Sequence, residues 1–177
     1  PVPFIDLSAQ HKPIADELLE AVTRVLDSGQ FVLGEEVATL ETEIASFCDS
    51  RHAVSCASGT DALVLSLEAA GVAPGDEVIC PSFTFYATAE AIARVGATPV
   101  FCDIEAASLN MDPAHVAELV SERTRAIVAV HLFGRPMDVT RLPAGIPVIE
   151  AAAQAFGAGL PGARAGSGRG RVVGRPR

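Results

Sequence analysis

The chain has 177 residues, of which 49% are hydrophobic and 20% are charged. This length and composition suit a globular protein with one substantial core and leave too little chain for two comfortable domains. A net charge of −9 argues against a nucleic-acid surface. No apolar run approaches the roughly 20 residues that cross a bilayer, and the first residues lack the pattern of a secretory signal. We therefore expect a cytoplasmic protein with no nucleic-acid and no membrane partner.

Cysteine and histidine spacing gives no sign of a metal site. Cys48, Cys56, Cys80 and Cys102 are too far apart for a Cys-x-x-Cys pair. Three of them end predicted strands, where cysteine usually behaves as a small buried apolar residue. The histidines are scattered without metal-ligand spacing. We expect neither a metal nor a disulfide.

Apolar spacing predicts two helices near the start of the chain. The first runs from Ile14 to Leu26 and stops at Gly29, and the second covers residues 35–47. Beyond them, short Val- and Ile-rich runs alternate with helical patterns, which indicates βαβ units and a mostly parallel sheet flanked by helices. The predicted strands are residues 53–56, 77–80, 99–102, 126–130 and 148–149, and the helices between them are residues 61–70, 87–95 and 113–119.

The last residues differ from the rest of the chain. Residues 161–177 are rich in glycine and arginine and have no apolar period, so they cannot build a core element. We expect a disordered Arg/Gly-rich tail there, after a folded unit over residues 1–160. The arginines from Arg164 onward fit an unstructured tail better than a nucleic-acid surface.

A possible phosphate cradle lies at Ser58-Gly59-Thr60, where a predicted strand turns into a predicted helix. Such a turn leaves backbone N–H groups unpaired at the positive end of the helix dipole, and its small side chains let an anion approach closely. An ordinary helix cap uses the same residue types, so the turn alone does not decide between the two interpretations.

Two other segments are predicted to reach the same edge of the sheet. Residues 81–89 follow a strand and carry Phe85 and other aromatic side chains, and residues 148–158 end a strand and offer Gln154 as a polar group. Parallel sheets bind ligands at the carboxyl ends of their strands. An aromatic ring there can stack on a flat heterocycle, or it can simply fill the core beside the strand.

These motifs resemble the DegT/DnrJ/StrS family of sugar aminotransferases, which use pyridoxal 5'-phosphate. The resemblance implies an α/β, three-layer fold of the aspartate-aminotransferase type (fold type I), of which this chain looks like the N-terminal, truncated part of the large domain. The matching segments are residues 3–7, 28–34, 36–37, 58–63, 74–78, 81–89, 96–101 and 130–134, with Glu150 and Gln154.

Carried over from the family, Gly59 and Thr60 hold the cofactor phosphate, Phe85 stacks on the pyridine ring, and Gln154 lies near the ring hydroxyl. In the family these residues orient a cofactor whose own electronics stabilise the carbanion. The implied reaction moves an amino group, commonly from glutamate, to a keto group of a nucleotide-linked sugar. A homodimer is expected for the intact enzyme.

The chain departs from the family pattern at two points. Ala151 stands where the family has an aspartate that keeps the pyridine nitrogen protonated, and adjacent Glu150 is a poor substitute because successive strand side chains point to opposite faces. Lys12 is the sole lysine and lies far from the cradle in sequence, so we assign no catalytic residue and no Schiff-base lysine. We expect the 177-residue chain to be inactive alone.

Two other functions stay open. The chain can be a non-catalytic fragment that binds a phosphate-bearing ligand or docks on an intact homologue. A Rossmann-like nucleotide binder ranks lowest, because no glycine fingerprint follows the first predicted strand.

Overall fold

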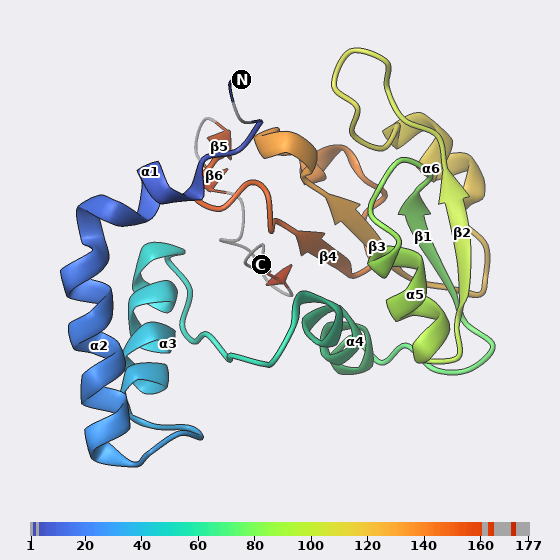
Figure 1. Ribbon diagram of the computed structural model, residues 1–177. Helices are drawn as coiled ribbons and strands as arrows, with labels where there is room; N and C mark the ends of the chain where they lie inside the picture. The colour runs from blue at the N-terminus through green and yellow to red at the C-terminus, as the bar shows by residue number, and fades with distance from the viewer. Residues whose placement is uncertain (1, 3, 161–162, 165–170, 173–177) are drawn as a thin grey trace. The chain divides into compact units, whose positions relative to one another are not determined.

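The computed structural model describes residues 2, 4–160, 163–164 and 171–172. Residue contacts divide the chain into two compact units, Pro1–Glu43 and Ile44–Arg177 (Figure 1). The hydrophobic core belongs to the second unit, since the buried apolar side chains of the described residues run from Ala45 to Ala155. No helix in the described part of the chain is both long and apolar enough to cross a bilayer.

The first unit is helical. It contains α1 (Leu7–His11), the 3₁₀ turn η1 (Lys12–Ile14), α2 (Ala15–Ser28) and the start of α3 (Glu35–Phe47). The predicted stop after α2 is confirmed, because Gly29 has a left-handed backbone (φ 66°) that ends the helix. The bounds predicted for α3 are also confirmed.

The second unit is built on a parallel sheet. Its strand order is β2-β1-β3-β4-β7, and every neighbouring pair is parallel. A separate antiparallel pair joins β5 and β6. The bounds are β1 (Glu77–Pro81), β2 (Thr98–Cys102), β3 (Thr124–Val130), β4 (Val148–Ala151), β5 (Gly159–Leu160), β6 (Ala163–Arg164) and β7 (Arg171–Val172).

Helices cover both faces of this sheet. On one face, α4 (Gly59–Ala69) and α5 (Ala87–Arg94) lie side by side (Figure 1), and Leu67 and Ile92 pack on Val128. On the other face, α6 (Pro113–Leu119) and the connections through η2 (Leu132–Gly134) and η3 (Val139–Arg141) cover the strands, with Val116 packed against Ile127. The predicted three-layer α/β architecture is therefore confirmed.

Local capping explains why the helices begin where they do. The Asp112 carboxylate accepts the Ala114 N–H at 2.9 Å, and Pro113 occupies the first helical position, so α6 has its predicted bounds. Ser58 caps α4 in the same way, which starts that helix two residues earlier than predicted.

The strand predicted at residues 53–56 is wrong. These residues are irregular, and the side chain of Val54 is 86% exposed. A short β-prone run forms a strand only when another strand pairs with it, and no described strand pairs with this segment. Cys56 is consequently exposed rather than buried, whereas Cys80 and Cys102, which also end predicted strands, are buried as expected; Cys48, which ends no predicted strand, is buried too.

Part of the predicted tail has described structure. Ala163–Arg164 pairs with β5, and Arg171–Val172 pairs with β4. Residues 161–162, 165–170 and 173–177 lie outside the described residues, so the disorder expected for them stays a prediction.

Candidate functional site

The candidate site lies at the carboxyl edge of the sheet. Because the strands of the sheet are parallel, the segments that follow β1 and β4 leave it at the same edge. Phe85 is in the segment after β1, and Gln154 is in the segment after β4. The short connection of residues 70–76 makes α4 run antiparallel to β1, so the N-terminus of α4, with Gly59 and Thr60, points to that edge too. The topology thus places all four predicted site residues at one edge.

The first turn of α4 has two unpaired N–H groups. Ser58 is extended (φ −151°, ψ 160°), and its hydroxyl accepts the Asp61 N–H at 3.1 Å and donates to the Asp61 carboxylate at 2.8 Å. The Ala62 N–H starts the helical ladder by bonding to the Ser58 carbonyl at 3.0 Å. Within the described part of the chain, no hydrogen bond uses the N–H of Gly59 or Thr60. These two donors, at the positive end of an 11-residue helix, can bind an anion.

An ion pair moderates the one negative charge in this turn. The Asp61 carboxylate lies 3.7 Å from the Arg94 guanidinium, and both side chains are about half exposed. Such an exposed pair contributes little to stability. It does offset the Asp61 charge, which would otherwise oppose an anion bound at the helix N-terminus.

Phe85 presents an aromatic ring at the edge. Its side chain is 77% exposed, while Pro81 and Ala87 on either side are buried and fix the ends of the segment. The carbonyl of Phe85 accepts the Thr88 N–H at 3.1 Å, and the hydroxyls of Thr84 and Thr88 are 3.0 Å apart. The ring is not used to fill the core, so its surface is open for stacking on a flat ligand.

Gln154 has a fixed amide orientation. Its Oε1 accepts the backbone N–H of Phe133 at 2.8 Å. Because an N–H can be accepted only by the amide oxygen, the amide nitrogen of Gln154 must be the group that faces away from this bond. Gln154 therefore offers N–H donors to a ligand oxygen.

The spacing of these groups follows from the sheet. β3 lies between β1 and β4, so the segments that carry Phe85 and Gln154 are two strand spacings, about 10 Å, apart. The segment after β3 fills the interval, and the Phe133 ring lies 6.2 Å from the Phe83 ring. No hydrogen bond among the described residues joins Gly59 or Thr60 directly to Phe85 or Gln154.

A buried pair of side chains near Gln154 was not predicted from the sequence. His131 and Glu150 lie 2.8 Å apart, from Nε2 to Oε2, and their side chains are 1% and 5% exposed. The signal available in the sequence was a histidine directly after a buried strand and a glutamate inside the next one. Nothing local to either residue shows that the two strands are neighbours.

Glu150 and Ala151 face opposite sides of the sheet, as expected. Ala151 packs with the cluster of Leu63 and Ile149 beside α4 and α5, whereas Glu150 points to the other face and meets His131. Glu150 therefore cannot supply a carboxylate at the place where the Ala151 side chain points.

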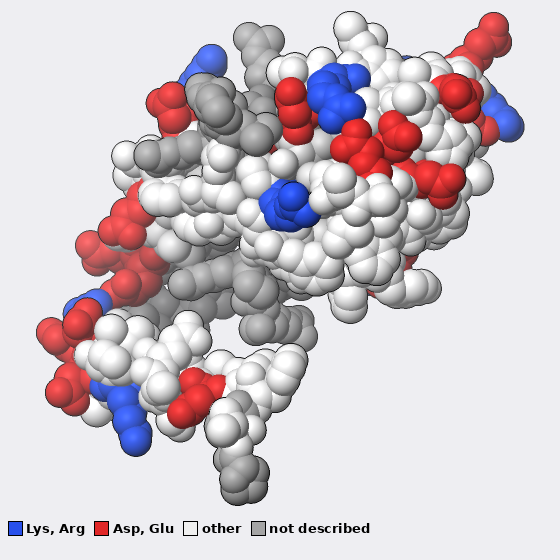
Figure 2. Space-filling model, turned by 90° about the horizontal axis from the view of Figure 1, so that it is seen from above, with Lys and Arg blue, Asp and Glu red and all other residues white. Residues whose placement is uncertain are grey.

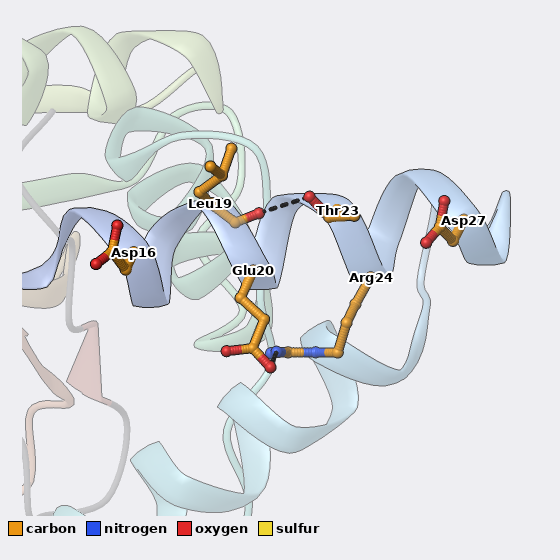
Figure 3. Close-up of a pocket in the computed structure, with 6 residues that line it drawn as sticks. All are labelled: Asp16, Leu19, Glu20, Thr23, Arg24 and Asp27. Carbon is orange, nitrogen blue, oxygen red and sulfur yellow. Dashed lines mark hydrogen bonds and ion pairs between the residues drawn. The ribbon is translucent and has the colours of Figure 1, made fainter.

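The hollow in Figure 3 lies on the first unit and carries no comparable arrangement. The Thr23 hydroxyl donates to the Leu19 carbonyl at 2.8 Å, and Arg24 pairs with Glu20 at 3.8 Å and with Glu36 of α3 at 3.1 Å, so these polar groups already have partners in the protein. Its lining consists of Asp16, Leu19, Glu20, Thr23, Arg24 and Asp27.

Charge and metal-binding groups give no second candidate. Figure 2 shows acidic side chains gathered on the face in view with a few basic ones among them, in keeping with the net charge of −9. Among the described residues, no group of three or more His, Cys, Asp or Glu side chains could hold a metal ion.

Comparison with known proteins identifies the family. The model of the DegT/DnrJ/EryC1/StrS aminotransferase family matches residues 12–172. The chain belongs to this family. A UDP-N-acetyl-3-dehydro-alpha-D-glucosamine 3-aminotransferase of Acidithiobacillus ferrooxidans is 46% identical over 171 residues, which is 94% of this chain and 46% of that protein.

Solved structures of similar proteins agree with the fold. DesV of S. venezuelae, in complex with a ketimine intermediate, is 43% identical with a TM-score of 0.91, covering 94% of this chain and 46% of DesV. The ntda protein of Bacillus subtilis, with bound cofactor PMP, is 31% identical with a TM-score of 0.84, covering 88% of this chain and 37% of that one. The predicted fold type I architecture is confirmed, and the chain spans less than half the length of these relatives.

The edge fits part of the pyridoxal phosphate that DegT/DnrJ/EryC1/StrS aminotransferases use. The free N–H groups of Gly59 and Thr60 suit a phosphate, the exposed Phe85 ring suits a heterocycle, and the Gln154 amide suits a ring oxygen. The groups at this edge therefore fit the phosphate and the ring, and Ala151 offers no carboxylate of the kind that the resemblance implies.

Proposed function

We propose that this chain forms the phosphate- and ring-binding part of a pyridoxal-phosphate-dependent aminotransferase of nucleotide-linked keto-sugars, with glutamate as amino donor. The observation that carries the proposal is the convergence of the α4 N-terminus, Phe85 and Gln154 at one sheet edge. The named activity of the A. ferrooxidans relative, a 3-aminotransferase of a UDP-linked dehydro-sugar, supports the substrate class.

Each residue has a separate binding role in this proposal. The N–H groups of Gly59 and Thr60 donate to the phosphate, the ring of Phe85 stacks on the heterocycle and shields it from water, and the Gln154 amide donates to the ring oxygen. The bound cofactor supplies an electron sink for the negative charge that develops when the amino donor loses its α-proton. For the intact enzyme we propose a homodimer.

A second candidate is a non-catalytic binder of a phosphate-bearing ligand or of an intact homologue. Two observations favour it. The only lysine, Lys12, is far from the cradle in sequence, and Ala151 provides no charge for the ring nitrogen. We propose that the 177-residue chain by itself binds the cofactor without turning over, because a lysine normally supplies both the covalent anchor and the proton transfer.

The test combines binding and turnover on the purified chain. Pyridoxamine phosphate is titrated and followed by its fluorescence, and amino transfer from glutamate to a UDP-linked keto-sugar is then measured with excess pyridoxal phosphate. We expect saturable binding and no sustained transfer. A Lys12→Arg variant is the matched control. It removes the only lysine that can form a Schiff base with pyridoxal phosphate, while binding at the edge is kept.

The outcomes separate the two candidates. Saturable binding that weakens when inorganic phosphate competes supports the cofactor site. Failure to bind pyridoxamine phosphate at millimolar concentration would refute it. Sustained transfer by the chain alone would refute the non-catalytic candidate, and loss of that transfer in the Lys12→Arg variant would show that Lys12 reaches the cofactor.

A further inference from the structure

The hydrogen bonds of the buried pair His131 and Glu150 show which ring nitrogen of His131 carries the proton. The backbone N–H of Met137 donates to Nδ1 of His131 at 3.0 Å, so Nδ1 carries no proton. A neutral imidazole then has its proton on Nε2, which donates to Oε2 of Glu150 at 2.8 Å. His131 is therefore a neutral bridge that accepts from one segment and donates to another.

This bridge holds three pieces of chain together. His131 follows β3, Glu150 lies within β4, and Met137 closes the segment of residues 132–137 that contains η2. A buried carboxylate is costly unless its hydrogen bonds are complete. The His131 N–H supplies one of these hydrogen bonds to a carboxylate oxygen of Glu150. Because His131 precedes the segment and Met137 ends it, the bridge fixes residues 132–137 at both ends.

The clamped segment contains a strained residue. Phe133 has a left-handed backbone (φ 55°, ψ 28°), which is unfavourable for a residue with a bulky side chain. Surrounding contacts must hold it in this conformation. The conformation directs the Phe133 N–H to Oε1 of Gln154, 2.8 Å away, and this bond sets the orientation of the Gln154 amide.

We propose that His131 and Glu150 are positioning residues for Gln154. They fix the segment of residues 132–137, the segment fixes the Phe133 N–H, and the Phe133 N–H fixes the amide that faces the ligand. The effect of this positioning on a ligand rests on the proposed function. The phosphate end of the site, at the first turn of α4, is independent of this bridge because it is built from local hydrogen bonds of Ser58.

The test uses two substitutions that separate the two ends of the bridge. His131→Gln puts an amide N–H at the position of Nε2, so the Glu150 carboxylate stays satisfied. The planar amide then holds its oxygen on the side away from the former position of Nδ1, so the Met137 N–H loses its acceptor and the segment is released. Glu150→Gln keeps an oxygen that accepts the His131 N–H and serves as the conservative rescue. Neither variant leaves a buried charge without a partner, so both are expected to fold.

Two readouts are measured on the full chain. Amide hydrogen exchange compares Phe133 with Ile79, a core residue of β1, and titrations compare pyridoxamine phosphate with inorganic phosphate. In His131→Gln we expect Phe133 exchange to rise about 10-fold with Ile79 unchanged, and affinity for pyridoxamine phosphate to fall about 10-fold while that for inorganic phosphate changes less than about twofold. In Glu150→Gln all four values should stay near wild type.

The results distinguish this inference from the proposed function. Equal acceleration at Phe133 and Ile79 would show a merely structural role and overturn the proposal, as would unchanged exchange at Phe133. Equal losses for both ligands would overturn it as well. If the wild-type chain binds neither ligand, the proposed function fails, and the exchange comparison alone still decides whether His131 and Glu150 position the segment.

Discussion

Replacing Gly59 by proline tests the phosphate cradle at a single atom. Gly59 is the first residue of α4, where proline fits a helix because its ring sets a helical φ and no helical partner is lost. The extended backbone of Ser58 (φ −151°, ψ 160°) suits a residue that precedes proline. The substitution therefore removes one N–H and leaves the helix in place.

The expected loss follows from that one hydrogen bond. A hydrogen bond to a charged group contributes about 1.5–3 kcal/mol, and about 1.4 kcal/mol corresponds to a tenfold change in affinity. Because Gly59 is exposed, the lower end of this range applies, and we expect the dissociation constant for inorganic phosphate to rise about 10-fold. Stability should be unchanged or slightly raised, since proline restricts the unfolded chain.

Isothermal titration calorimetry with inorganic phosphate at fixed ionic strength measures the effect. Gly59→Ala is the matched variant, because it adds a side-chain carbon at the same position but keeps the N–H. The difference between the two variants isolates the hydrogen bond. Phosphate binding to Gly59→Pro that is as tight as binding to wild type would refute the cradle, provided that circular dichroism shows the helix content to be intact.

Three other substitutions or treatments test the packing of the second unit. Leu67→Ala should lower the free energy of unfolding, measured in urea, by about 2–5 kcal/mol because Leu67 is fully buried. Leu65 is exposed on the same helix, so Leu65→Ala should lower it by less than about 1 kcal/mol. Equal losses would contradict the core assignment. Gly96→Ala should lower the melting temperature, because Gly96 has φ +81° and a Cβ there would lie 2.8 Å from a proline side chain; an unchanged melting temperature would count against this geometry. Iodoacetamide at pH ~8 should label exposed Cys56 and spare Cys80, whose pKa burial raises to about 12. Labelling of Cys80 in the native protein, detected by mass spectrometry, would contradict this burial. The raised pKa of Cys80 also predicts that its contribution to stability is complete below pH 9.0 and is lost as the pH rises toward about 12.

The elements with strong local signals could be predicted from the sequence. α3 and α6 have their predicted bounds, and α6 does so because Asp112 and Pro113 form a cap that needs no distant partner. The strand predicted at residues 53–56 failed for the opposite reason. Its residues favour a strand, but a strand exists only beside another strand, and pairing is decided by chain that lies far away in sequence.

In the candidate site, too, local features could be predicted from the sequence and long-range contacts could not. Gly59 and Thr60 could be located from a short turn motif, because their geometry depends on neighbouring residues. The orientation of Gln154 could not, because it depends on the Phe133 N–H, 21 residues away. His131 was missed because only the register of β3 against β4 brings it to Glu150.

The chain spans less than half the length of its relatives, and the two ends of the candidate site depend on different amounts of its structure. The phosphate end of the edge requires only the first turn of α4, whose cap is complete within four residues. The ring end requires β3 and β4 to be paired in register, with the buried bridge between them satisfied. If the chain binds the cofactor as proposed, any loosening of the sheet should weaken binding of the ring before binding of the phosphate. The ratio of the affinities for pyridoxamine phosphate and inorganic phosphate would then report how well β3 and β4 are held together.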